Sequence, residues 1–125
     1  EASVTQVLVV LAKNQLLVRG ELMRVEDLKD NAKEFIANPY NRPDLAEMPT
    51  KAIISLKNDR GTEYGTYLSV YNELKAAYNE LWSESSMRKF GVPYSDDLPL
   101  AWRKDIRDEI PFVISEAEPT NFGEE

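Results

Sequence analysis

The chain has 125 residues, of which 42% are hydrophobic and 30% charged, a composition typical of one globular domain with a single core. Its formal net charge of −7 argues against nucleic-acid binding and against docking on anionic lipid, because both rely on Lys and Arg side chains. Neither Cys nor His is present, which excludes disulfides, thiolate nucleophiles and the Ser-His and Cys-His catalytic systems.

The sequence contains no segment of the kind that crosses a membrane. No apolar stretch approaches the roughly 20 residues that a membrane-spanning helix needs, and no signal peptide is present. Glu1 is not a usual native start. We therefore expect the chain to be an excised domain, with a further segment before it in the full protein.

The beginning of the chain predicts a β-hairpin. The Val-rich run Val7–Ala12 is typical of a buried strand, and Gln15–Val18 predicts a second strand. Lys13 and Asn14 form a two-residue turn between them, because Asn tolerates positive φ. Gly20 ends the strand pattern.

An amphipathic helix is predicted over Val25–Ala37, followed by a loop. Glu26 and Asp27 suit the first turn of the helix, although no good N-cap residue precedes them. Residues 38–50 contain three prolines, which exclude a helix or a central strand. The apolar face of the helix consists of Leu28, Ala32, Phe35 and Ile36.

A third strand and a long helix come next. Ala52–Leu56 predicts the strand, and the turn Asn58–Thr62 leads into the helix, with Thr62 as its N-cap. The apolar face of this helix runs for about four turns. It consists of Tyr67, Val70, Tyr71, Leu74, Ala77, Tyr78, Leu81 and Trp82.

The last third of the chain is more acidic, with 5 basic and 10 acidic residues in 83–125. After an irregular link at Phe90–Tyr94, a short helix is predicted, capped by Asp97 and ended by Pro111. Phe112–Ser115 predicts a last strand before a tail. The apolar residues of the short helix are Leu98, Trp102, Ile106 and Ile110.

This alternation of strands and helices predicts an α+β fold in one domain over residues 1–125. We expect a two-layer sandwich in which a small mixed sheet carries two main helices on one face. The order is β-β-α-β-α-(helical insert)-β, and residues 79–111 form the insert.

The order of the elements and the residues at their joints resemble the ExbD/TolR family of biopolymer transport proteins, and ExbD more closely. In that family a Val-rich strand, a turn and a second strand ending in Gly open the soluble domain, and a recurrent Leu follows in the first helix. A third strand then runs into an Asp, a Tyr opens the second helix, and the last strand runs into Ser or Thr and an acidic residue. The matching residues here are Val7–Ala12, Lys13-Asn14, Leu16–Gly20, Leu28, Ile53–Leu56, Asp59, Tyr64-Gly65, Val70, Leu74–Ala77 and Val113–Glu116.

The match covers roughly residues 5–78 and 112–118, and the chain departs from the family at three points. The loop 38–50 is longer and rich in Pro. The family has Gly where Tyr78 stands and then turns at once into the last strand, whereas here some 30 residues intervene. The family's membrane helix, with its proton-pathway Asp, is absent from this chain.

The resemblance implies a non-enzymatic periplasmic domain, anchored in the inner membrane by an N-terminal helix and needing no cofactor. It implies work with an ExbB/TolQ-like channel protein and a TonB/TolA-like partner, as a homodimer, to power transport across the outer membrane. Two alternatives remain open: a TolR-like domain that binds peptidoglycan, or an unrelated adaptor or ligand-binding domain of the same fold.

Both end strands are candidates for the edges of the sheet, where a partner chain can add a strand. The candidate partner-binding residues on them are Val7, Val9, Val113, Ile114 and Ser115.

Two further candidates lie between the third strand and the long helix. Asp59 follows a strand and precedes a helix, which is a common place for a functional residue and equally for a turn carboxylate. Tyr64 is a candidate partner-binding residue and begins a stripe with Tyr67, Tyr71 and Tyr78. This stripe has two interpretations, core packing and ligand stacking, and its helical spacing is more typical of core packing.

The acidic residues of the last third favour a solvated face over a site of chemistry. They lack the spacing of a Ca²⁺ loop, and no apolar setting encloses a carboxylate pair as glycoside hydrolysis requires. We expect no metal and no catalytic residue. The acidic residues concerned are Asp96, Asp97, Asp105, Asp108 and Glu109.

Overall fold

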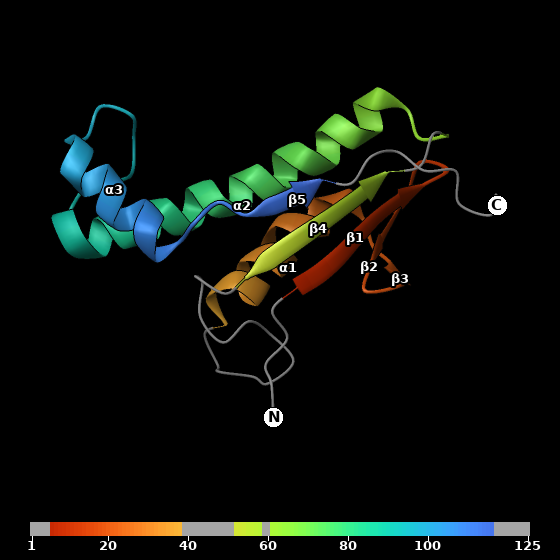
Figure 1. The fold of residues 1–125 in the computed structure, drawn as a ribbon, viewed down its shortest axis with the longest axis horizontal. Helices are drawn as coiled ribbons and strands as arrows, with labels where there is room; N and C mark the ends of the chain where they lie inside the picture. The colour runs from red at the N-terminus through yellow and green to blue at the C-terminus, as the bar shows by residue number, and fades with distance from the viewer. Residues whose placement is uncertain (1–5, 39–51, 59–60, 117–125) are drawn as a thin grey trace.

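The computed structural model describes residues 6–38, 52–58 and 61–116, which form a small mixed sheet and three helices (Figure 1). The strands are β1 (Gln6–Ala12), β2 (Gln15–Val18), β3 (Glu21–Leu22), β4 (Ile53–Asn58) and β5 (Ile114–Glu116). The helices are α1 (Val25–Ala37), α2 (Tyr64–Phe90) and α3 (Leu100–Glu109). The α+β fold predicted from the sequence is confirmed.

The strands lie in the order β3-β2-β1-β4-β5. β1 pairs antiparallel with β2 and parallel with β4, and β4 pairs parallel with β5. The sheet is therefore antiparallel on one side of β1 and parallel on the other.

The predicted hairpin is confirmed, and a second tight turn extends it. Lys13 and Asn14 have φ values of 54° and 62°, and this left-handed pair twists the chain as a two-residue hairpin requires. Arg19 and Gly20 form a second left-handed turn of the same kind, with φ values of 56° and 84°. The second turn produces β3, which the sequence analysis missed because it took Gly20 as the end of the pattern.

Helices α1 and α2 cover one face of the sheet (Figure 1). α1 has the predicted bounds, and its four predicted core residues are all buried. The sheet contributes alternate residues to the same core, as the period of a strand requires. These sheet residues are Val9, Leu11, Leu16, Val18, Ile54 and Leu56.

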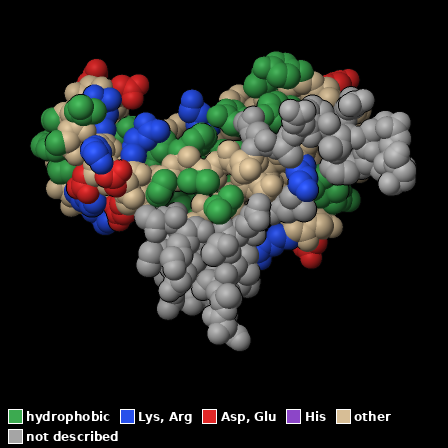
Figure 2. Space-filling view, viewed as in Figure 1, with side chains coloured by type: hydrophobic (Ala, Val, Ile, Leu, Met, Phe, Trp, Pro, Cys, Tyr) green, Lys and Arg blue, Asp and Glu red, His purple; other side chains and the backbone are tan. Residues whose placement is uncertain are grey.

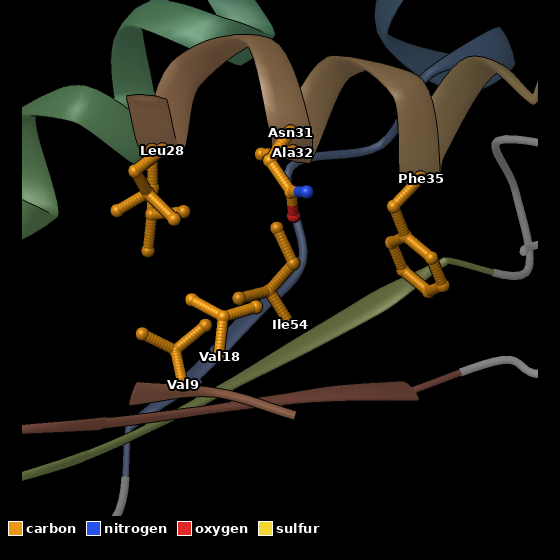
Figure 3. Close-up of a pocket in the computed structure, with 8 residues that line it drawn as sticks. Val9, Val18, Leu28, Asn31, Ala32, Phe35 and Ile54 are labelled. Atoms are coloured by element: carbon orange, nitrogen blue, oxygen red, sulfur yellow. The ribbon is translucent and has the colours of Figure 1, made fainter. Parts of the chain in front are cut away.

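A cavity of about 10 Å³ lies between α1 and the sheet (Figure 3). Its lining is apolar except for Asn31, and the side chains of Leu28 and Phe35 on α1 face those of Val9 and Val18 on the strands. This volume is about the minimum for one water molecule. The space is a small packing gap and is too small for a ligand.

Helix α2 starts one residue later than predicted and continues well past Trp82. Glu63, not Thr62, precedes its first residue, and the helix ends only at Gly91, which has a φ of 78°. The Gly91 N–H donates to the carbonyls of Ser86 and Met87, at 3.2 and 3.1 Å, and this closes the last turn. With 27 residues α2 is about 40 Å long, so its C-terminal half extends past the sheet (Figure 1).

The short helix α3 packs on this C-terminal half of α2. It begins after Pro99 and not at Asp97, because the residue before a proline is disfavoured in helical conformation. Leu98 therefore lies outside the helix, while Ile106 and Ile110 are buried as predicted. The Trp82 Nε1–H donates to the Ile110 carbonyl at 2.8 Å, which joins the two helices at the end of α3.

Candidate functional site

The first predicted edge, carrying Val7 and Val9, lies in the middle of the sheet. Residues 6–11 of β1 pair with β4, and residues 9–12 pair with β2. Val9 lies opposite both Val18 and Leu56. The prediction that β1 is an edge is therefore wrong for Val9, whose backbone has strand neighbours on both sides, whereas Val7 pairs, among the described strands, with β4 alone.

The second predicted edge is correct but begins later than expected. β5 lies at the end of the strand order and pairs, among the described strands, with β4 alone. Ile114 and Ser115 belong to it, opposite Ile54 and Ser55, whereas Val113 precedes it.

The direction of the β5 backbone follows from one hydrogen bond. The Ile54 N–H donates to the Val113 carbonyl at 3.2 Å. In a parallel ladder, alternate residues turn their N–H and C=O groups to opposite sides. Val113 and Ser115 therefore face β4, and the backbone groups of Ile114 face away from it.

At the opposite end of the sheet, β3 offers a poorer edge. It has two residues, Glu21 and Leu22, and both are exposed. A very short strand with a charged residue is how proteins blunt an edge against further pairing. β5 is also short and ends in Glu116, but it is one residue longer and its Ile114 is partly buried, so it remains the candidate for strand addition.

A row of aromatic side chains runs along α2 towards β5. Tyr64 stacks on Tyr67 with ring centroids 6.3 Å apart, and Tyr67 stacks on Tyr71 at 6.4 Å. Tyr71 meets Phe112 edge-on at 6.5 Å, and Phe112 lies two residues before β5. The row thus connects the beginning of α2 with the approach to the edge strand.

The tyrosine stripe divides between surface and core. Tyr64 is 72% exposed, Tyr67 and Tyr71 are partly buried, and Tyr78 is fully buried. Burial raises the pKa of the Tyr78 hydroxyl, and the Val113 backbone offsets part of this effect. The ring centroids of Tyr78 and Phe112 are 5.0 Å apart. Tyr78 is therefore a core residue, and it anchors the segment that leads into β5.

The joint around Asp59 is visible only from its neighbours, because Asp59 lies outside the described residues. The Asn14 side-chain oxygen accepts from the Glu63 N–H at 2.9 Å, and the Asn14 N–H donates to the Thr62 hydroxyl at 3.4 Å. The hairpin turn is therefore tied to the beginning of α2. From the sequence, Asn14 was predicted only as a turn residue, and its contact with the beginning of α2 was not predicted.

The acidic residues of α3 are engaged with lysines. Asp105 and Glu109 both pair with Lys89, at 3.2 and 3.0 Å, and Asp108 pairs with Lys104 at 2.7 Å. Burial alone would raise the pKa of Glu109, but hydrogen bonds from Lys89 and Ser85 outweigh it and leave that pKa below its ordinary value. Within the described ranges, no three carboxylates come together as a metal site.

Comparison of the sequence with known protein families and with curated proteins finds no match. Over residues 6–38, 52–58 and 61–116, no helix has the length and apolar character to cross a bilayer.

Proposed function

We propose that the chain is the periplasmic domain of an ExbD-like subunit in a complex that uses proton-motive force to power transport across the outer membrane. In this role the domain recognises a partner and performs no chemistry. Support comes from the element order, in which a hairpin, a helix, a strand, a helix and a closing strand follow one another as the resemblance implies. The partners are an ExbB/TolQ-like channel protein, a TonB/TolA-like protein and a second copy of the chain.

The observation that carries the proposal is the contrast between the two end strands. β1, which would follow the membrane anchor directly, is held between two neighbours, so a pull along it loads hydrogen bonds on both sides. β5 is at the edge and has one neighbour among the described strands. A domain that transmits force between proteins needs both properties. One strand must stay paired under load, and one surface must allow a bound partner to dissociate.

The partner segment that fits this edge is an extended chain adding to β5. Its backbone would pair with the outward groups of Ile114, and its side chains would reach Tyr71 and Phe112, which lie next to the edge. The net charge of −7 favours a segment with basic residues, because complementary charge speeds association.

The proposal is tested by binding a TonB-like periplasmic segment to Ile114→Pro and Ile114→Ala. Proline removes the outward N–H and blocks strand addition, while the bond from Ile54 to Val113 stays intact. Alanine keeps that N–H and is the matched control. We expect Ile114→Pro to lose binding in calorimetry and Ile114→Ala to retain it.

A pull-down with peptidoglycan completes the test. Equal binding of the segment by both variants contradicts the role of the β5 edge. Retention on peptidoglycan without binding of the segment contradicts the motor role and supports a cell-wall anchor.

A further inference from the structure

The helical insert builds a cleft of about 430 Å³ that has no counterpart in the sequence analysis. Four segments surround it: the middle of α2, the link after Gly91, helix α3 and the approach to β5. This volume lies within the range of small-molecule sites, about 300–1,000 Å³. The lining residues are Tyr71, Lys75, Asn79, Trp82, Tyr94, Asp96, Arg107 and Phe112.

The floor of the cleft is aromatic. Trp82 is almost completely buried, with its ring centroid 5.3 Å from that of Tyr94 and 6.3 Å from that of Phe112. Tyr94 and Phe112 are themselves only partly buried. The exposed parts of Tyr94 and Phe112 therefore offer apolar surface to a ring, while Trp82 packs against both of them.

The rim of the cleft is charged, with a positive excess. Lys75, Arg107 and Asp96 are all exposed, and within the described part of the chain none of them forms an ion pair. The Arg107 guanidinium lies 4.6 Å from the centroid of the Trp82 ring. In Figure 2, Lys and Arg side chains lie along the hollow between the α3 end and the rest of the surface.

We propose that this cleft binds an aromatic amino acid carboxylate, either free or as the last residue of a peptide. The carboxylate pairs with Lys75 and Arg107, since hydrogen bonds between charged groups are the strongest available here. The ligand N–H, as ammonium or amide, donates to Asp96 or Asn79, and the ring lies on the aromatic floor. This inference does not depend on the proposed transport role.

The two tryptophans allow a direct test by ¹H–¹⁵N NMR. Trp82 lines the cleft, and Trp102 stacks on Phe90 outside it, so the Trp102 indole signal is an internal control. The probes are phenylalanine, N-acetylphenylalanine, phenylalanine amide and the peptide Ala-Ala-Phe. We expect saturable shifts of the Trp82 indole signal with every probe except the amide, which lacks the carboxylate.

Two substitutions test the rim, and a third is the control. Lys75→Gln and Arg107→Gln should each weaken binding about tenfold, the effect of losing one charge-assisted hydrogen bond. Lys104→Gln, on α3 but away from the cleft lining, should leave binding unchanged. If Arg107→Gln disturbs α3, the exposed Lys75 still provides the test.

The outcomes distinguish a free amino acid from the last residue of a peptide, and some of them would overturn the proposal. Tighter binding of Ala-Ala-Phe than of phenylalanine identifies a peptide end, and the reverse identifies a free amino acid. The proposal fails if no probe gives a saturable Trp82 shift below about 10 mM, a very weak affinity. It also fails if phenylalanine amide binds as well as the acids, or if Lys75→Gln has no effect.

Discussion

β1 and β5 lie towards opposite ends of the chain, and the sheet uses them differently. β1 has a neighbour on each side and contributes two nearly inaccessible residues, Val9 and Leu11, to the core. β5 has three residues, and among the described strands it pairs with β4 alone. The comparison shows that apolar side chains bury a strand in the core. Whether the strand can pair with a partner chain depends on whether one side of its backbone lacks a neighbouring strand.

The largest effect is expected where β1 meets the core. Leu11→Ala should lower the free energy of unfolding by about 2–5 kcal/mol, because Leu11 is completely buried and its truncation leaves a cavity. Leu22→Ala, on the exposed edge strand β3, should change it by less than about 0.5 kcal/mol. Urea unfolding of both variants measures the contrast, and equal losses would contradict the assignment of β1 to the centre.

A smaller effect should distinguish the two sides of β5. Ser115→Pro removes the N–H that faces β4 and should cost about 1–3 kcal/mol, the effect of leaving a buried acceptor unpaired. Ile114→Pro removes the outward N–H and should cost less. If thermal unfolding ranks them in the opposite order, the backbone direction derived from the Ile54–Val113 bond is wrong.

The smallest effect concerns the ion pairs that hold α1 against α2. Glu80 accepts from Lys29 and from Lys33, the latter at 2.9 Å, and hydrogen bonds from these lysines lower the pKa of Glu80 below its ordinary value of 4.5. Because water still reaches both partners of each pair and screens their charges, Glu80→Gln should cost less than about 1 kcal/mol at neutral pH. Glu80→Gln is a control for the strand variants, because the loss of a surface ion pair should lower the free energy of unfolding less than the loss of strand pairing.

The pH dependence of that loss follows from the direction of the shift. A carboxylate whose pKa is lowered in the folded state stabilises the fold above its unfolded pKa, and this contribution disappears as the pH falls through the folded pKa. The difference between wild type and Glu80→Gln should therefore shrink as the pH falls below 4.5 and vanish once the pH is below the folded pKa of Glu80. A difference that persists at pH 2 would mean that Glu80 acts by packing and not by charge.

Local patterns in the sequence were enough to predict much of the fold. The bounds Val25–Ala37 and Gln15–Val18 are correct, because a helical period and a hairpin turn are properties of neighbouring residues. The end of α2 was not predicted, although Arg88 and Lys89 in the last turn, followed by Gly91, are a recognisable helix end. The apolar pattern weakens after Trp82 because buried positions of α2 there are serines, Ser85 and Ser86, and the Ser85 hydroxyl donates to Glu109 on α3.

The candidate site was predicted only in part, because strand neighbours depend on contacts distant in the sequence. Val7–Val10 carries apolar residues at consecutive positions, a signal of a strand covered on both faces, and this favours the centre of a sheet. The run was interpreted as a buried strand, but its position near the start of the chain was also taken to favour an edge. The cleft at Trp82 and Arg107 could not be predicted, since it requires knowing where α3 packs.

The central claim is that a partner strand adds to β5 while β1 remains closed. Hydrogen exchange of the Ile114 and Val9 amides, measured by NMR with and without a TonB-like segment, tests it directly. The account predicts that the Ile114 amide exchanges quickly in the free domain and becomes protected in the complex, while Val9 is protected in both. An Ile114 amide that exchanges at the same rate in the free domain and in the complex would contradict it.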